Sequence, residues 1–316
     1  MKSLISVVIP AYNEESGIKH FYQTLKKALP NKYNYEIIFI DDGSRDATMS
    51  VIDRIAEKDS SVKIISFSRN FGKEAATTAG ILESKGAAIL ILDADGQHPV
   101  ELIPTFIDTW EKGSQVVVGI RSENQKEGFI KKHGSKLFYH IFNALTSEKI
   151  TPGTTDFRLL DAEVREAFSL LEEKSRITRA LIDWLGYKKE YIPFIANPRE
   201  FGEASYSTKK LIGLAMNSFV SHSTVPLYLS GYLGVVIVPL SLLLGIFIII
   251  EQYILGDPLQ LKITGSASLG VFIVFLVGII LACQGLVALY ISRVHEEVKN
   301  RPLYLINRAA STLRDK

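Results

Sequence analysis

Cysteine is nearly absent from this sequence, since Cys283 is the only one among 316 residues. A disulfide framework and a metal site built on cysteine are therefore excluded. Both common phosphate-binding loops are missing: no G-x-G-x-x-G follows the first predicted strand, and no G-x-x-x-x-G-K-S/T occurs anywhere. The six histidines show no H-x-x-x-H spacing, and the formal net charge of +2 gives no general signal for nucleic-acid binding.

Charge is also missing from two long ranges, residues 211–250 and 263–292, which contain no Asp, Glu, Lys or Arg. A helix crosses a bilayer with roughly 20 apolar residues, so the most apolar parts, 226–255 and 267–291, predict two membrane helices. Lys and Arg residues lie before the first and after the second. This pattern predicts an integral membrane protein with both termini in the cytoplasm and the short loop between the helices outside. A buried helical hairpin of a soluble domain is the alternative.

The first 120 residues alternate between strand-like and helix-like stretches. Strands are predicted near residues 4–9, 35–40, 62–67, 87–92 and 115–120, with amphipathic helices between them. Repeated β-α units with short connections are typical of a mostly parallel sheet with helices on both faces. A polar cluster follows each strand, so these clusters should meet at one rim of the sheet.

The clearest of these clusters lies in residues 87–99, AAILILDADGQHP. Asp93 and Asp95 directly follow a buried strand, and Gln97 adds an amide oxygen. Such hard oxygen ligands suit Mg²⁺ or Mn²⁺, which in turn hold a diphosphate. Lys73 and Arg121, which follow other strands, could supply further positive charge. The alternative is an ordinary strand that ends in an acidic turn.

Two further segments carry candidate chemistry. Residues 127–145 combine a partial apolar stripe with several basic side chains, and they predict an amphipathic helix at a membrane surface. A surface helix packed on its own domain is the alternative. Residues 154–161, TTDFRLLD, place Asp156 two positions before Arg158. A simple ion pair that caps the next helix would also explain this pair.

The motifs VVIPAYNEE, IDDGSRDAT, RNFGKEAA and DADGQHP occur in this order, each at the end of a strand. Together they resemble the family 2 glycosyltransferases with the GT-A fold. With TTDFRLLD and the apolar C-terminal part, the chain resembles more closely the polyprenyl-phosphate glycosyltransferases of that family. The resemblance implies an α/β fold class: a GT-A, Rossmann-like nucleotide-sugar domain with a mostly parallel sheet, amphipathic interface helices and two C-terminal transmembrane helices.

The resemblance also implies a domain division. Residues 1–205 would form the cytoplasmic catalytic domain, which includes the interface helix at 127–145. Residues 206–225 would be a juxtamembrane amphipathic segment, residues 226–292 the two-helix membrane domain, and residues 293–316 a cytoplasmic C-terminal segment. By the same likeness the membrane is the bacterial inner membrane.

Roles for individual residues follow from the same resemblance. The nucleotide would contact a set of residues drawn from four motifs: Pro10, Tyr12, Glu14, Asp41, Asp42, Lys73 and Asp93. Asp93, Asp95 and Gln97 would surround the divalent metal ion. The catalytic set would be Asp95, Arg121 and Asp156, and the acceptor phosphate would contact Arg121, Lys132, Ser135 and Arg199.

The expected reaction is the transfer of one sugar from a nucleotide sugar, UDP-glucose above all, to a polyprenyl phosphate. It would depend on Mg²⁺ or Mn²⁺ and invert the anomeric centre. The Q-x-x-R-W motif of processive synthases is absent, which favours a single transfer. GDP-mannose as donor and another acceptor stay open as alternatives, as does a homo-oligomer. A lipid-sugar flippase and an inactive scaffold are disfavoured, the first because the apolar ranges contain no central charge or broken helix.

Overall fold

The fold is described from a computed structural model. The structure describes residues 3–122, 153–174, 176–197 and 265–312, together with isolated positions between 232 and 255. The chain divides into two compact units. The first comprises Met1–Asn143, Glu148–Ser207 and Asn300–Lys316, and the second comprises Ala144–Ser147 and Thr208–Lys299.

The first unit is built on a seven-stranded sheet with the order β3-β2-β1-β4-β6-β5-β7. Its strands are β1 (Leu4–Ala11), β2 (Asn34–Asp41), β3 (Val62–Ser66), β4 (Ala88–Ile91), β5 (Val116–Arg121), β6 (Thr154–Asp161) and β7 (Lys189–Phe194). Every neighbouring pair is parallel except those that involve β6, which runs antiparallel to both β4 and β5. The predicted strands and the mostly parallel arrangement are confirmed. β6 was not predicted as a strand.

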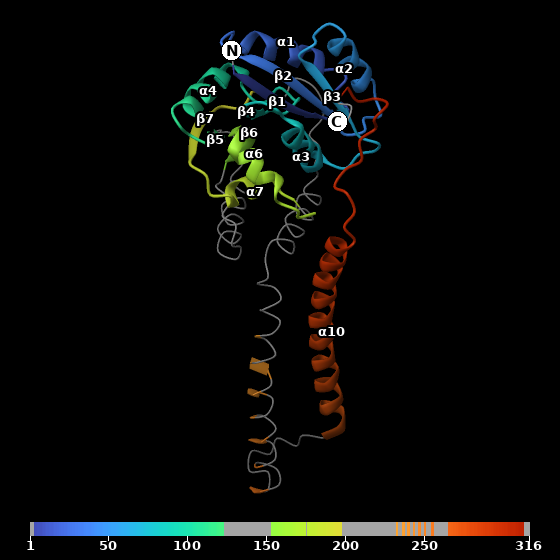
Figure 1. Cartoon of the computed structure of the whole chain (residues 1–316). Coiled ribbons are helices and arrows are strands. Elements are labelled where there is room, and N and C mark those ends of the chain that lie inside the picture. The colour runs from blue at the N-terminus through green and yellow to red at the C-terminus, as the bar shows by residue number, and fades with distance from the viewer. Residues whose placement is uncertain are drawn as a thin grey trace. The chain divides into compact units, whose positions relative to one another are not determined.

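Helices cover both faces of the sheet (Figure 1). They are α1 (Ile18–Ala28), α2 (Thr48–Ala56), α3 (Lys73–Glu83), α4 (Ile103–Glu111) after the short 3₁₀ helix η1 (Val100–Leu102), α6 (Ala162–Ser169) and α7 (Thr178–Trp184). In β1 to β6, alternate residues enter opposite cores, as the period of two in a strand requires. Val7 belongs to the core that includes residues of α1, α2 and α4, whereas Val8 belongs to the core that includes residues of α3, α6 and α7.

The antiparallel direction of β6 positions the candidate site. Because β4 and β5 run parallel to the other strands, their carboxyl ends lie at the same rim of the sheet. β6 runs the opposite way, so its first residues reach this rim, and Thr154 pairs with Ile120 near the end of β5. Asp156 is thereby brought to the edge where β4 ends and Asp93 follows.

A segment near the C-terminus belongs to the same unit. Residues 303–312, named here the 303–312 segment, run along the outer edge of β3 (Figure 1). Phe67 and Ile306 form an antiparallel bridge, Asn307 N–H donates to the Ser66 carbonyl at 2.7 Å, and Thr312 N–H donates to the Ile64 carbonyl at 3.0 Å. This segment covers an edge strand whose backbone groups would otherwise be open to pairing.

The second unit contains α10 (Gly265–Val298), the long helix of the C-terminal half. Among the residues that the structure describes, no helix combines the length and the apolar composition required to cross a membrane. This finding contradicts the two membrane helices predicted within 226–292 and the integral-membrane localisation derived from them. Most of the first predicted span, residues 226–255, lies outside the residues that the structure describes.

Several other predictions lie outside the described residues. These include the interface helix at 127–145 and the juxtamembrane segment at 206–225. The predicted domain division therefore stays a prediction.

Candidate active site

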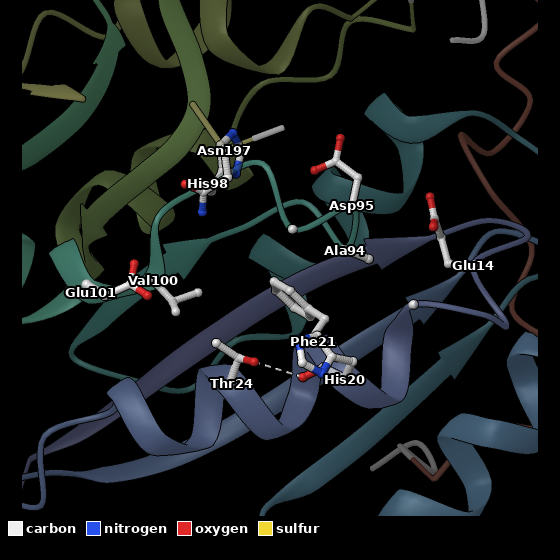
Figure 2. A pocket seen from close by; sticks show the side chains of 12 residues that line it. Glu14, His20, Phe21, Thr24, Ala94, Asp95, His98, Val100, Glu101 and Asn197 are labelled. Atoms are coloured by element: carbon white, nitrogen blue, oxygen red, sulfur yellow. Dashed lines mark hydrogen bonds between the residues drawn. The ribbon is translucent and has the colours of Figure 1, made fainter. Parts of the chain in front are cut away.

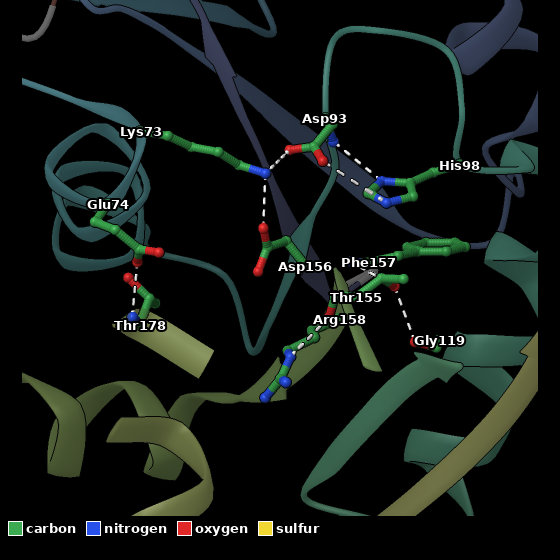
Figure 3. Close-up of polar contacts among 10 residues, drawn as sticks. All are labelled: Lys73, Glu74, Asp93, His98, Gly119, Thr155, Asp156, Phe157, Arg158 and Thr178. Atoms are coloured by element: carbon green, nitrogen blue, oxygen red, sulfur yellow. Dashed lines mark hydrogen bonds and ion pairs between the residues drawn. The ribbon is translucent and has the colours of Figure 1, made fainter. Parts of the chain in front are cut away.

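The centre of the candidate site is an ion-pair triad formed by Lys73, Asp93 and Asp156 (Figure 3). Lys73 is the first residue of α3, Asp93 follows β4, and Asp156 lies near the start of β6. The Lys73 Nζ lies 2.6 Å from Asp93 Oδ1 and 2.6 Å from Asp156 Oδ2. Both acids predicted from separate motifs thus share one cation. Lys73 was expected at the nucleotide, and its bridging position was not foreseen.

The charges of this triad stabilise one another. Burial would raise the pKa of the Asp156 carboxyl, but Lys73, Arg179 and Arg158 outweigh it and lower the pKa to about 2. Burial would lower the pKa of Lys73, whereas Asp93 and Asp156 raise it above its ordinary value. Asp156 is therefore ionised at neutral pH. A carboxylate with so low a pKa is a weak general base, since bases work best with a pKa near the operating pH.

His98 is a residue that the sequence reasoning did not assign. It is 7% exposed and stacks on Phe157 with ring centroids 5.3 Å apart. Its Nδ1 accepts a hydrogen bond of 3.2 Å from the Asp93 backbone N–H, and its Nε2 lies 3.8 Å from Asp93 Oδ2 (Figure 3). Burial lowers the pKa of His98, so the ring is neutral and orients Asp93. The sequence signal that could have identified His98 is its position inside the motif DADGQHP.

Asp93 and Asp95 line different pockets. Asp95 lines one with Glu14, His20, Glu101 and Asn197 (Figure 2). Asp93 and Gln97 line a second pocket with Asp156. The turn between them is fixed by Asp95 Oδ1, which accepts from the Gln97 backbone N–H at 3.1 Å.

The predicted metal ligands were Asp93, Asp95 and Gln97. Within the described residues, no group of three or more His, Cys, Asp and Glu side chains is placed to hold a metal ion. Their carboxylate and amide oxygens still suit Mg²⁺ or Mn²⁺, and Asp93 already holds the Lys73 ammonium. The donor set fits a divalent cation chemically, and the assignment stays a prediction.

The second pocket also contains two guanidinium groups. Arg121, the last residue of β5, and Arg179, from α7, line it together with Thr154, Thr155 and Asp156. The Nε of Arg179 is buried without a hydrogen-bond partner among the described residues. Arg121 was predicted, whereas Arg179 was missed because its helix carried no motif. Cations and hydroxyls around one cavity are a suitable lining for a phosphate.

Arg158 is buried rather than presented to the pocket. It is 1% exposed, and its Nη1 donates to the Arg179 carbonyl and to Asp183 Oδ1, each at 3.3 Å. The simple Asp156–Arg158 ion pair considered from the sequence is therefore not what fixes Arg158. It anchors the backbone of α7 next to Arg179.

The remaining predicted residues fall into three groups. Asp41 and Asp42 are each 3% exposed, and Asp42 accepts from the N–H groups of Phe71 and Gly72 at 2.7 and 2.9 Å. Pro10 is buried in β1, whereas Tyr12 is 39% exposed. A third group, Lys132, Ser135 and Arg199, lies outside the described residues.

Comparison with known proteins finds similar sequences over most of the chain. A family model described as "Glycosyl transferase family 2" matches residues 6–168. An uncharacterized glycosyltransferase of Synechocystis sp. is 40% identical over 96% of this chain and 94% of its own length. A prophage-derived bactoprenol glucosyl transferase of Shigella flexneri is 37% identical over 96% of this chain and 98% of its own.

A solved structure gives the same fold. Glucosyl-3-phosphoglycerate synthase from Mycobacterium tuberculosis, in complex with Mn²⁺, UDP and phosphoglyceric acid, superposes with a TM-score of 0.51 and 19% sequence identity. The match covers 69% of this chain and 76% of that one. At this identity the likeness concerns the fold alone.

Proposed function

The chain belongs to glycosyl transferase family 2 and is a hexosyltransferase, and we propose that it transfers one glucose unit from UDP-glucose to a polyprenyl phosphate. The products would be polyprenyl-phosphate glucose and UDP. The observation that carries this proposal is the pocket that joins Asp93 and Asp156 to Arg121 and Arg179. In one cavity, the carboxylates would hold cations that bind the donor diphosphate. The two guanidinium groups would bind the phosphate that acts as nucleophile.

The acceptor and the donor are inferred from relatives of different kinds. The Shigella flexneri relative is named a bactoprenol glucosyl transferase and matches nearly its whole length, which supports a polyprenyl phosphate as acceptor. The Mycobacterium tuberculosis enzyme was solved with UDP and Mn²⁺, which is consistent with a uridine nucleotide and a divalent cation.

The reaction needs no proton abstraction. A phosphate monoester has a second pKa near 6, so the acceptor is mostly dianionic at pH 7. One of its oxygens would attack the anomeric carbon as the bond from that carbon to the UDP oxygen breaks. UDP leaves with the electron pair, and a single displacement of this kind inverts the anomeric centre.

Charge repulsion between the two substrates is then the main barrier. Arg121 and Arg179 would neutralise the acceptor phosphate, because guanidinium groups bind phosphate oxygens through paired hydrogen bonds. Lys73, which pairs with the pocket residues Asp93 and Asp156, would act on the donor. Preorganised cations of this kind stabilise charge that develops in the transition state.

Asp156 would act by positioning. Its carboxylate is ionised and its Oδ2 accepts a 2.6 Å hydrogen bond from Lys73. It therefore holds the ammonium at the rim and lacks the basicity expected of a proton acceptor.

A divalent cation fits the same picture. Asp93, Asp95 and Gln97 would hold Mg²⁺ or Mn²⁺, and the ion would supply positive charge to the departing diphosphate. His98 would keep the Asp93 carboxylate oriented, as groups behind a metal ligand commonly do.

A donor and acceptor screen tests the proposal. Purified full-length protein is incubated in detergent with undecaprenyl phosphate, Mg²⁺ or Mn²⁺, and UDP-glucose or GDP-mannose, and the lipid product is identified by mass. Glucosyl-lipid formed from UDP-glucose is the expected result. Transfer from GDP-mannose alone would overturn the donor, and turnover that ignores the long isoprenoid phosphate would overturn the acceptor.

A further inference from the structure

The 303–312 segment contacts the loop that carries Lys73 to the active site. The ring of Tyr304 stacks on Phe67 with centroids 4.9 Å apart and an interplanar angle of 10°. Phe67 in turn meets the edge of Phe71 at 5.7 Å. Both phenylalanines belong to the stretch that links β3 to α3, so Tyr304 begins a row of three contacting aromatic rings along this loop.

Backbone hydrogen bonds tie the segment to the same place. Ser68 N–H donates to the Leu305 carbonyl at 2.9 Å, immediately after the Phe67–Ile306 bridge. The loop is therefore held by an aromatic contact and by a backbone hydrogen bond. Both come from residues more than two hundred positions later in the sequence.

The other side of the loop is held by Asp42. Its two carboxylate oxygens accept from the N–H groups of Phe71 and Gly72. Gly72 has a φ of +98°, a conformation that side chains rarely adopt, and Lys73 follows it directly. A small shift of Phe71 would thus move the base of the Lys73 side chain that reaches Asp93 and Asp156.

From these contacts we propose that the 303–312 segment is a positioning element of the donor site, with Tyr304 as its principal residue. Among the described residues, the ring of Tyr304 contacts Phe67, which is not a residue predicted to bind substrate. It acts through Phe67 and Phe71 on the backbone that carries Lys73. The expected change in donor KM rests on the proposed function. The expected effect on the position of the loop does not, because it concerns only contacts within the protein.

Protection of the β3 edge is a simpler role for the segment, and the contacts at its far end fit that role. Thr312 Oγ1 accepts from Ile64 N–H at 2.8 Å, and Ser311 Oγ accepts from Ser66 N–H at 2.9 Å. Tyr304 differs because it contacts the residues after β3, where the strand has ended and the loop begins. The test must therefore separate loop position from overall stability.

The first measurement needs no substrate. Amide hydrogen exchange at Phe71 and Gly72 is compared in the wild type, Tyr304→Ala and Tyr304→Phe. Exchange should quicken in Tyr304→Ala and return towards wild type in Tyr304→Phe, which keeps the ring. Tyr191→Ala is the matched control, because Tyr191 is 42% exposed on β7, at the opposite edge of the sheet.

The second measurement is kinetic. An aromatic pair contributes enough that its loss should raise the donor KM about three- to tenfold. The kcat at saturating donor should stay within about twofold, because Lys73 itself is retained. Tyr304→Phe and Tyr191→Ala should both keep the wild-type KM.

The outcomes separate this proposal from the proposed function. Unchanged exchange at Phe71 and Gly72 together with an unchanged donor KM in folded Tyr304→Ala overturns the positioning role. If Tyr304→Ala does not fold, Tyr304→Leu, which keeps an apolar side chain but no ring, is measured in the same way. If the wild type transfers no sugar from UDP-glucose, the proposed function fails, and hydrogen exchange still decides the role of Tyr304.

Discussion

Lys73 donates a hydrogen bond of 2.6 Å to Asp156, which lies 83 positions later in the sequence. The contact exists because α3 begins at the rim where β3 ends, while β6 enters the same rim antiparallel to its neighbours. It gives Asp156 a cation partner and an ionised state. Under the proposed function, the relationship explains how Asp156 would serve without accepting a proton.

Replacement of Asp156 should therefore weaken transfer without ending it. Asp156→Asn keeps the shape and loses the charge that orients Lys73, so kcat should fall about 10- to 100-fold. Asp95→Ala should abolish detectable transfer, because it removes a predicted metal ligand. UDP release measured with both variants checks this, and an equal total loss in the two would contradict the positioning role of Asp156.

Arg179 should govern the affinity for the acceptor. A hydrogen bond to a charged group contributes about 1.5–3 kcal/mol, so Arg179→Met should raise the KM for polyprenyl phosphate by at least about tenfold. Arg179→Lys should recover part of the loss, since it keeps the charge without the paired donors.

Donor and acceptor titrations of the Arg179 variants distinguish the two phosphates. The KM for UDP-glucose should change far less than the KM for the acceptor. If the donor KM rises instead, Arg179 belongs to the nucleotide side of the pocket, and its assignment to the acceptor is wrong.

Much of the fold follows from sequence pattern. Short apolar runs such as residues 87–92 end in polar clusters, and the helices between them have one apolar face, so a parallel sheet with an active rim was predictable. β6 was missed because TTDFRLLD mixes polar and apolar residues without the regular alternation of a half-buried strand. Its Arg158 is 1% exposed, and only the tertiary contact with Asp183 explains how a charged residue can lie inside a strand.

The candidate site was predictable as motifs, though its internal contacts were not. Asp93, Arg121 and Asp156 do line one pocket. Lys73 pairs with Asp93 and Asp156, and Tyr304 contacts Phe67, although these residues lie far apart in the sequence. His98 contacts Asp93 within the same motif. No spacing rule encodes such contacts. The prediction of two membrane helices is contradicted among the described residues, where no helix has the length and apolar composition to cross a membrane.

His98 should matter through Asp93 alone. His98→Phe keeps a ring to stack on Phe157 but removes the nitrogen that accepts from the Asp93 backbone N–H, so kcat/KM should fall about 10- to 100-fold, as for other groups that orient a ligand. His98→Asn keeps an acceptor and should lose less catalysis, although it loses stacking. The melting temperature of each variant serves as the control. A fully active His98→Phe would show that the ring is needed for packing only.

Glu36 should make stability depend on acid pH. It is 3% exposed and accepts from Ser6 Oγ at 2.5 Å, from the Lys85 backbone N–H at 2.6 Å and from Lys63. Burial alone would raise its pKa, but these donors lower it below the ordinary value of 4.5. The unfolded chain therefore binds the proton more readily than the folded one. The stabilisation is complete above pH 4.5 and is lost as pH falls from there through the folded pKa.

Glu36→Gln is the variant that reveals this contribution. At neutral pH it should lower the free energy of unfolding by about 2 kcal/mol, because it removes hydrogen bonds to a charged group. The difference in the free energy of unfolding between wild type and variant should narrow as pH falls below 4.5. The wild-type carboxylate then becomes protonated and is neutral, like the Gln side chain. Urea unfolding at a series of pH values measures it, with the exposed Glu173→Gln as a control expected to change little. A gap that stays constant with pH would mean that Glu36 stabilises the fold through packing and not through its charge.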